Sequence, residues 1–248
     1  MRLARFARLF CMAFIALLGA LPAQAQYGGA YFADYFRIYS RPRLSSFSVE
    51  YGAGSAYYTG DLVRPFNVSA QNYLLNLSFN AGMRYQITDF ISLRGSINYF
   101  RLQATSDRVD EPDFAGRSFK SNNLEGSVEL VHDILPKSYT ENFLSRFNGY
   151  LFAGVGGLRY MPRSTETGQL LPKDPRWSYT NSSVVFPVGF GVNFHLFEDS
   201  WLGIEAGYRF TRTDFLDNIG YPPFGGPFDG YYIYGFRASI QLYKGYAM

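Results

Sequence analysis

The chain has 248 residues, with 23 Lys and Arg against 20 Asp and Glu, and a single cysteine. Three of the arginines and Cys11 fall within residues 1–25, so the rest of the chain carries 20 charges of each sign and no thiol. This balance lacks the basic excess typical of nucleic-acid-binding proteins, and the missing thiols exclude disulfides and thiolate metal sites.

The N-terminus has the three parts of a secretory signal peptide. Arg2, Arg5 and Arg8 precede an apolar run over residues 9–21, which ends in small residues. The run is too short to cross a bilayer as a helix, and the small-x-small ending predicts cleavage between Ala25 and Gln26. We therefore expect residues 1–25 to be removed on export.

Residues 26–45 precede any clear strand, and we expect them to form a periplasmic leader. Phe32, Tyr35, Phe36 and Tyr39 follow helical spacing, and Pro42 would end such a helix. A loosely ordered leader and an aromatic helix lying at a membrane interface or on a partner both fit this segment.

Eight later segments alternate between apolar residues and small or polar residues with a period of two, as strands with two unlike faces do. One such pair is the hairpin over residues 184–211, which is apolar on one face and carries small or charged residues on the other. Glycines leave the phase of one segment, 147–160, unassigned. The predicted strands cover residues 46–58, 72–87, 90–102, 122–131, 147–160, 184–196, 202–211 and 231–243.

The connections between these strands alternate in length. Long polar segments cover 59–71, 103–121, 161–181 and 212–230, and short ones cover 88–89 and 197–200. The 132–146 connection takes the place of a short turn but is long for a periplasmic one. Aromatic residues make up 19% of the chain, which also has 25 glycines. This pattern is typical of bacterial outer-membrane proteins. It predicts an all-β fold over residues 46–248, an eight-stranded antiparallel transmembrane β-barrel with both termini periplasmic.

A soluble lipocalin-like barrel is the alternative architecture. Its apolar face would point inward and its outer face would carry the charges. Here the face opposite the apolar one is rich in Gly, Ser and Asn, which solubilise a surface poorly. The pattern therefore favours a barrel whose apolar face contacts outer-membrane lipids.

The charged residues within the strands fall on the face that would line the lumen. Four are acidic and four are basic, so they can pair inside a closed barrel of this size. Charge compensation is the simplest interpretation, and a proton or ion path is the alternative. The predicted lumen charges are Glu50, Arg84, Arg94, Glu125, Glu129, Glu205, Arg209 and Arg237.

Catalytic and metal-binding patterns are weak. His132 and His195 are the only histidines, and they fall on different predicted strands. Acidic residues in the long connections lack the regular spacing of calcium ligands. We therefore expect no enzyme activity, metal, cofactor or small-molecule substrate, although a Ser-His-acid site is the alternative for an enzyme.

Several segments resemble one family of small outer-membrane barrels. They are AYYTGDL at 56–62, YLFAGVGG at 150–157, RYMP at 159–162, VGFGVNF at 188–194 and WLGIEAGYRFTRTDFLDN at 201–218. Together they resemble the DUF6089 group, which includes the PorG-like subunits of the type IX secretion system. The resemblance implies a non-enzymatic barrel that anchors a periplasmic ring through a lipoprotein and its partner.

The resemblance also implies that partner contacts fall on the periplasmic side. The segments expected there are the 26–45 leader, the 132–146 connection and the 198–200 turn. A stand-alone OmpX-like barrel that interacts through its long loops is the alternative function, and a barrel enzyme is the third. Within 132–146 the candidate contacts are His132, Asp133, Lys137, Tyr139, Glu141, Phe143 and Arg146.

Overall fold

The computed structural model describes residues 46–60, 76–88, 90–106, 118–134, 147–164, 181–197, 199–217 and 229–244. The expected cleavage site at Ala25 and Gln26 and the 26–45 leader lie outside these ranges. The described residues form eight strands, which are β1 (Ser46–Thr59), β2 (Leu77–Gln86), β3 (Ile91–Thr105), β4 (Ser118–Asp133), β5 (Phe147–Ser164), β6 (Ser182–Phe197), β7 (Ser200–Thr211) and β8 (Gly230–Lys244).

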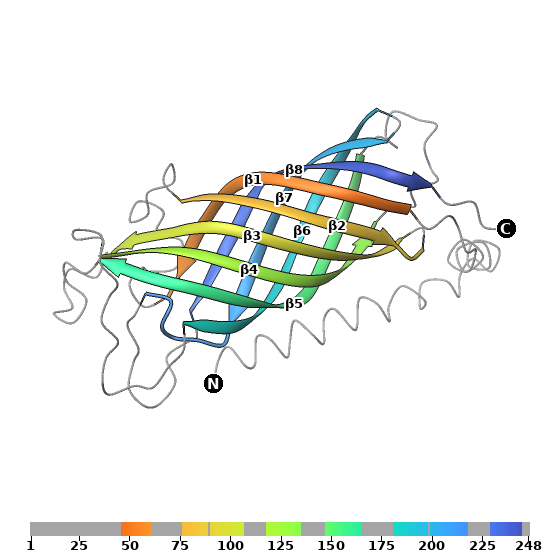
Figure 1. Ribbon diagram of the computed structural model, residues 1–248. Helices are drawn as coiled ribbons and strands as arrows, with labels where there is room; N and C mark the ends of the chain where they lie inside the picture. Colours follow the sequence, from red (N-terminus) through yellow and green to blue (C-terminus); the bar gives the residue numbers. More distant parts are fainter. Residues whose placement is uncertain are drawn as a thin grey trace, which may run out of the picture. The chain divides into compact units, whose positions relative to one another are not determined.

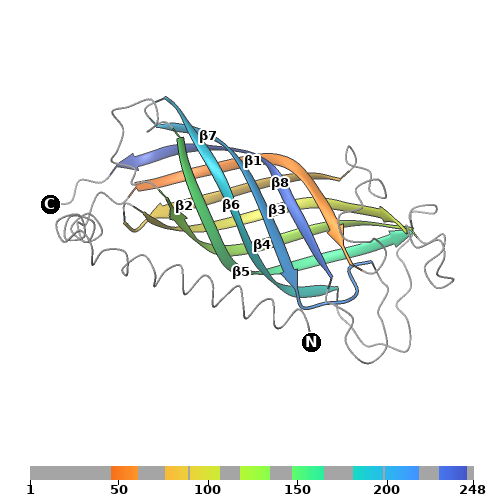
Figure 2. The same ribbon diagram turned by 180° about the vertical axis from the view of Figure 1, so that it is seen from behind.

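The strands close into one barrel in sequence order. Each strand pairs antiparallel with the next, and β8 pairs with β1 to complete the ring. Figures 1 and 2 show the tilted strands of this ring from opposite sides. A closed sheet leaves no strand edge unpaired, which is the condition for a sheet to cross lipid.

The outer face of the barrel is apolar around its circumference. Ile97 on β3, Ile204 on β7 and Phe236 on β8 are 61%, 61% and 62% exposed. Large apolar side chains stay this exposed in a stable protein when lipid is the surrounding solvent. The predicted eight-stranded transmembrane barrel is therefore confirmed. Among the described residues, no helix is long and apolar enough to span a membrane.

The structure settles the phase of β5 that the sequence left open. Asn148, Tyr150 and Phe152 point into the lumen and are buried, whereas Phe147 and Val155 are exposed on the outer wall. The register with β4, which pairs Asp133 with Tyr150, fixes this orientation.

At the end of the barrel that carries the long connections, the polarity of the wall inverts. Along β3 the outward side chains are apolar as far as Tyr99 and polar beyond it. The inward side chains change in the opposite sense, from polar to apolar. Beyond Tyr99, β3 carries Arg101, Gln103 and Thr105 outward and buries Phe100, Leu102 and Ala104 inward.

This inversion means that the wall continues past the lipid as a water-exposed barrel with an apolar core. The ends of β3, β4 and β5 lie together at this end of the barrel (Figures 1 and 2). The inversion also explains why three predicted strands are too short at this end of the barrel. Their predicted limits were 102, 122 and 160, where the apolar-outward pattern stops, but the strands reach Thr105, Ser118 and Ser164. The predicted 72–87 strand begins at Leu77, and residues 72–75 lie outside the described ranges.

Two layers therefore fill the interior. The layer towards the short turns is polar and charged, and the layer towards the long connections is apolar and aromatic. The apolar layer includes Leu216, which lies beyond the end of β7 and has 0% exposure. Its members are Ala56, Tyr58, Phe100, Leu102, Ala104, Phe119, Leu158, Tyr160, Val185, Leu216, Tyr231 and Ile233.

Hydrogen bonds hold this inserted segment in place. The Tyr58 hydroxyl donates to Asp217 Oδ2 at 2.7 Å and lies 2.9 Å from Asp229 Oδ1. The backbone N–H of Leu216 donates to Asp229 Oδ2 at 2.9 Å. We call Tyr58, Leu216, Asp217 and Asp229 the lumen cap.

Candidate functional site

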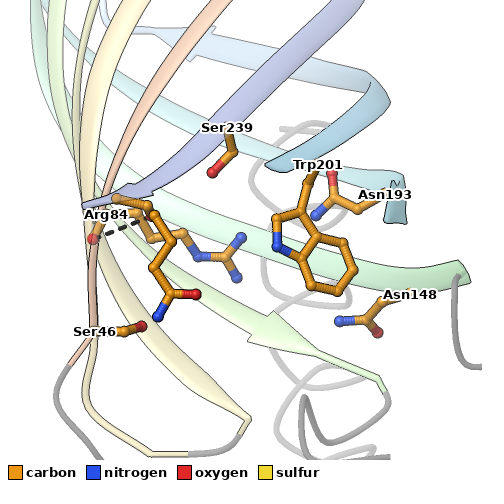
Figure 3. Close-up of a pocket in the computed structure, with 8 residues that line it drawn as sticks. Ser46, Arg84, Asn148, Asn193, Trp201 and Ser239 are labelled. Carbon is orange, nitrogen blue, oxygen red and sulfur yellow. Dashed lines mark hydrogen bonds between the residues drawn. The ribbon is translucent and has the colours of Figure 1, made fainter. Parts of the chain in front are cut away.

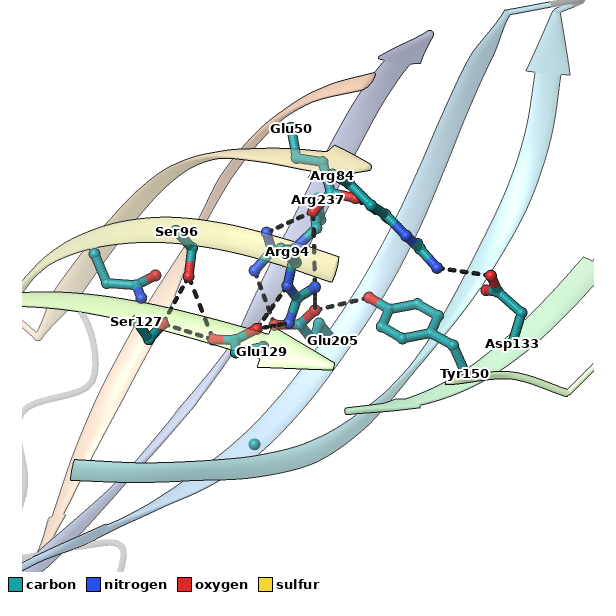
Figure 4. Close-up of polar contacts among 12 residues, drawn as sticks. Glu50, Arg84, Arg94, Ser96, Ser127, Glu129, Asp133, Tyr150, Glu205 and Arg237 are labelled. Atoms are coloured by element: carbon teal, nitrogen blue, oxygen red, sulfur yellow. Dashed lines mark hydrogen bonds and ion pairs between the residues drawn. The ribbon is translucent and has the colours of Figure 1, made fainter. Parts of the chain in front are cut away.

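The charged layer is built around Arg94, which β3 directs into the lumen with 0% exposure. Its Nε donates to Glu129 Oε2 at 2.6 Å, and its Nη1 donates to Glu205 Oε2 at 2.6 Å. Nη1 also lies 3.7 Å from Glu50 Oε2. One guanidinium thus contacts carboxylates from β1, β4 and β7, as Figure 4 shows.

Two further arginines complete this group. Arg237 donates from Nη1 to Glu50 Oε2 at 3.0 Å and from Nη2 to Glu205 Oε1 at 2.9 Å. Arg84 donates from Nη2 to Asp133 Oδ2 at 2.7 Å, and its Nη1 lies 3.8 Å from Glu50 Oε1. The network therefore ties β1, β2, β3, β4, β7 and β8 together across the lumen.

A second, smaller group surrounds Glu125. Arg209 Nε lies 3.8 Å from Glu125 Oε2, which accepts a hydrogen bond of 2.5 Å from the Tyr231 hydroxyl. Asn98 Nδ2 donates to Glu125 Oε1 at 3.0 Å. The Phe152 ring joins the two groups, because it lies 4.7 Å from the Cζ of Arg94 and 5.9 Å from that of Arg209.

Glycines on β6 and β7 make room for the aromatic side chains of β5. A Cβ placed on Gly189 would lie 2.5 Å from Phe152 Cζ, and one on Gly207 would lie 2.7 Å from the same atom. A Cβ on Gly191 would clash with the Tyr150 ring in the same way. The glycine alternation of the 184–211 hairpin thus serves packing inside the lumen.

All eight predicted lumen charges are buried and lie within these two groups. Asp133, which was predicted to contact a partner, is instead a ninth member, because its inward position on β4 places it beside Arg84 and Asn148. That prediction is wrong for Asp133, whose side chain has 0% exposure. The Tyr150 hydroxyl donates to Glu205 Oε2 at 2.8 Å. The sequence pattern did not identify the donors Tyr150 and Tyr231, because the glycines leave the phase of β5 open and an aromatic residue by itself signals no ion network.

The filled interior leaves little room for a solute. Near the short turns, the described lumen residues enclose a polar recess of about 20 Å³, enough for about one water molecule. Figure 3 shows Trp201 and Arg84 facing each other across it. At the other end of the lumen, the apolar layer covers the charges. The recess is lined by Ser46, Ser48, Arg84, Asn148, Asn193, Trp201, Ser239 and Gln241.

The two histidines lie on opposite faces of the wall. His132 is on the outer face of β4 and stacks on Phe90 with ring centroids 6.3 Å apart. His195 is on the inner face of β6, with its ring centroid 4.3 Å from that of Trp201. They therefore share no site. The other candidate partner contacts, Lys137, Tyr139, Glu141, Phe143 and Arg146, lie outside the described residues.

No protein-family model and no curated protein matches the chain. Among solved structures, Neisserial surface protein A is similar at 14% identity, with 79% of this chain and 97% of its own covered and a TM-score of 0.48. OprG from Pseudomonas aeruginosa is similar at 11% identity, with 80% of this chain and 97% of its own covered and a TM-score of 0.48. Ail, the attachment invasion locus protein of Yersinia pestis, is similar at 14% identity, with 80% of this chain and 99% of its own covered and a TM-score of 0.45.

At these values the likeness supports no statement about function, and the location of the protein follows from its own geometry. A closed antiparallel sheet with an even strand number, an apolar outer wall and a polar interior is the architecture of the bacterial outer membrane. The protein is an outer-membrane β-barrel. In such barrels the termini and the short turns are periplasmic and the long connections are extracellular.

Proposed function

We propose that this barrel is a non-enzymatic subunit that anchors periplasmic components of a type IX secretion system. The observation that carries the proposal is the uneven length of the periplasmic connections. Only residues 87–90 separate β2 from β3 and only residues 198–199 separate β6 from β7, whereas β4 and β5 are joined by the much longer segment 134–146. A periplasmic turn needs no such length to reverse the chain, so the added residues are available to bind a partner.

The interior supports the same conclusion by a different route. Buried ion pairs and the apolar layer occupy the lumen of the described barrel, so transport of solutes is not its role. A barrel with a filled lumen acts through its lipid-facing wall or its two ends. The segments at 56–62 and 201–218 resemble the PorG-like subunits, and this favours the periplasmic end.

The proposed contact surface begins and ends with exposed apolar side chains. Ile134, directly after β4, is 57% exposed, and Phe147, at the start of β5, is 42% exposed. Phe147 packs against Phe194 of β6 with ring centroids 4.9 Å apart. Apolar groups at the edge of the wall suit a partner that approaches the membrane surface, such as a lipoprotein of the secretion ring.

The test is a purification of the tagged barrel from its own cells in mild detergent, with mass spectrometry of co-purifying proteins. One variant replaces residues 135–145 by a short turn and keeps Asp133, which Arg84 needs. Its matched control shortens 218–228 and keeps Leu216, Asp217 and Asp229 of the lumen cap. We expect periplasmic proteins in fixed proportion with the wild type and the control, and their loss with the 135–145 variant.

Other results would point to the alternatives. Loss of partners only in the 218–228 variant would favour a surface barrel that acts through its extracellular loops. A barrel that purifies alone, even after cross-linking, would reject the anchor. If the barrel is an enzyme, His132→Ala or His195→Ala should abolish its function while the barrel stays folded. If it is an anchor, cells that carry either variant should still secrete normally.

A further inference from the structure

The lipid-facing wall is hollowed by a groove that crosses the strands from β1 to β5. The groove has a volume of about 700 Å³. On β3 it passes over Gly95, four residues before Tyr99, which is the last outward apolar residue of this strand. It therefore lies within the lipid-facing band. We call it the wall groove, and its outward lining includes Met83, Gly95, Ile97, Gly126, Val128 and Val155.

The strand register shows that the wall groove follows the direction of the hydrogen bonds between strands. Met83, Gly95 and Val128 lie directly opposite one another on β2, β3 and β4. Val49 of β1 lies opposite Met83, and Val155 of β5 lies opposite Val128. This row spans five strands, and four inter-strand spacings of about 4.8 Å make it roughly 19 Å long.

Three outward glycines, Gly95, Gly126 and Gly157, lie together on β3, β4 and β5. Gly126 is directly opposite Gly157 and diagonal to Gly95. A Cβ on any of the three would meet nothing within 4 Å, and none has a left-handed φ. Neither internal packing nor backbone conformation therefore requires glycine here, in contrast with the inward glycines of β6 and β7, which make room for Phe152. Glycine weakens a strand interior and is typical where a ligand or another backbone approaches closely.

The walls of the groove are apolar side chains that stand beside these glycines. Met83, Ile97 and Val128 are each more than half exposed. Ser96 and Ser127 also line the groove, but their hydroxyl groups lie on the lumen side and are hydrogen-bonded to each other at 2.9 Å. An occupant of the groove is therefore held by apolar contact and dispersion rather than by hydrogen bonds from these side chains.

The height of the groove indicates what fills it. Strands of outer-membrane barrels tilt by roughly 35–45°, so a row of about 19 Å across them rises by roughly 12 Å. This is about half of an apolar band that is roughly 25 Å tall. A membrane-spanning helix would need contact over the whole band, because it crosses about 30 Å of hydrocarbon. One acyl chain of a single leaflet matches a groove of this height.

The direction in which the groove rises identifies the leaflet. At its β1 end, Val49 is three residues after Ser46, where the strand begins on the periplasmic side. At its β5 end, Val155 is four residues before the exposed Arg159, which already belongs to the polar part of the wall. The groove therefore rises towards β5, and its upper end opens near the headgroups of the outer leaflet.

We propose that the wall groove binds one acyl chain of an outer-leaflet lipid as an ordered ligand. The headgroup of this lipid lies above the β5 end, and the methyl end of the chain lies towards β1 and β2. The chain packs against the backbone of β3 and β4, which Gly95 and Gly126 leave uncovered. This site is on the lipid-facing wall and is independent of the periplasmic anchor.

The experiment uses the full-length barrel, purified and reconstituted in dimyristoylphosphatidylcholine vesicles. The probes are two photoreactive phosphatidylcholines, with a diazirine either near the headgroup end or near the methyl end of one acyl chain. After illumination, mass spectrometry of peptides maps the adducts. The variant carries Gly95→Leu and Gly126→Leu, which fill the groove. The matched control carries Ala53→Leu and Ala238→Leu, at two exposed outward positions outside it.

We expect adducts in the wild type to concentrate on β1 to β5 rather than on the rest of the wall. The headgroup-end probe should label β5 near Val155, and the methyl-end probe should label β1 and β2 near Val49 and Met83. Labelling of these strands should fall by roughly threefold or more in the filled variant, because a filled groove no longer encloses the chain. It should stay unchanged in the control.

Even labelling around the circumference, or unchanged labelling in the filled variant, would overturn the proposal. Reversed positions of the two probes would show that the chain comes from the inner leaflet, which would also reject it. Cross-linked barrel dimers that disappear in the filled variant would assign the groove to a second copy of the chain instead. If the double variant does not form a barrel, Gly126→Leu alone provides the same test.

Discussion

The guanidinium of Arg94 lies among the carboxylates of Glu50, Glu129 and Glu205, and the whole group is buried. A buried ion pair adds little net stability compared with an apolar pair, but removing one partner leaves an uncompensated charge. Arg94 is therefore the side chain whose loss the interior tolerates least, because three acidic groups depend on it.

We predict that Arg94→Gln lowers the free energy of unfolding by about 3–5 kcal/mol. The measurement is denaturant unfolding of the purified barrel in lipid or detergent. Arg159→Gln, an arginine on the exposed face of β5, is the matched control and should change this free energy by less than about 0.5 kcal/mol. Equal effects of the two substitutions would mean that the network contributes nothing specific.

The glycines allow a second prediction at the scale of one methyl group. Gly189→Ala places a Cβ against Phe152 and the Ala206 carbonyl, so we expect a loss of about 1–3 kcal/mol from overpacking. Gly126→Ala, on the outer wall of β4, meets nothing within 4 Å and should be neutral or slightly stabilising. Comparing the unfolding midpoints of the two variants checks this, and a tolerated Gly189→Ala would contradict the packing of the lumen.

Among the elements, β3 crosses from lipid to water within its own length. Single cysteines can report this crossing, because the only natural cysteine lies in the predicted signal peptide. We predict that spin labels at outward positions 93, 97 and 99 collide mainly with oxygen, and those at 101, 103 and 105 with a water-soluble nickel chelate. A lipid-like signal at 103 and 105 would show that the polar end of the strand does not leave the membrane.

The lumen cap should respond to pH through Asp229. Burial, together with the neighbouring Asp217 and Asp214 carboxylates, raises the pKa of Asp229 well above its usual value. A raised pKa means that the folded cap favours the protonated carboxyl group. Its stabilisation is therefore present below the ordinary aspartate pKa of about 3.9 and is lost as the pH rises through the raised value.

We therefore predict that hydrogen exchange of residues 212–217, corrected for the intrinsic rate, becomes faster as the pH rises through this pKa. Asp229→Asn keeps the side chain neutral and should remove the pH dependence. Tyr58→Phe deletes the hydroxyl that contacts both carboxyl groups and should loosen the cap at every pH. Slower exchange at higher pH in the wild type would have the wrong sign for this mechanism.

At the scale of the whole molecule, the charged and apolar layers close the lumen in series. We predict that the purified barrel gives no stepwise conductance in a planar bilayer, whereas a general porin treated in the same way does. The physical reason is that ions would have to pass the buried apolar layer around Phe100 and Tyr231, whose rings stack at 4.7 Å. Reproducible channel steps from folded barrel would contradict a closed interior.

The sequence alone determined the barrel and the inward position of its charges. The period of two is a local property, so the parity of a residue within its strand assigns Arg84, Arg94 and Glu205 to the face opposite the large apolar side chains. Charged residues among lipid-facing side chains would be costly, and this makes the inward assignment robust without knowledge of any partner.

Only the tertiary structure decided which charges meet and where the membrane ends. Arg237 and Glu50 are 187 residues apart and pair because β8 closes onto β1, and Arg94 reaches Glu205 across 111 residues. Such contacts depend on barrel closure and register, which a local pattern does not contain. The ion pair of Asp133 with Arg84 depends on register in the same way. The tertiary structure also decided the phase of β5, because the glycines of this strand have no side chain to mark a face. Where the wall leaves the lipid, the outward side chains become polar and the inward ones apolar. The apolar-outward pattern therefore stops before the strand itself ends.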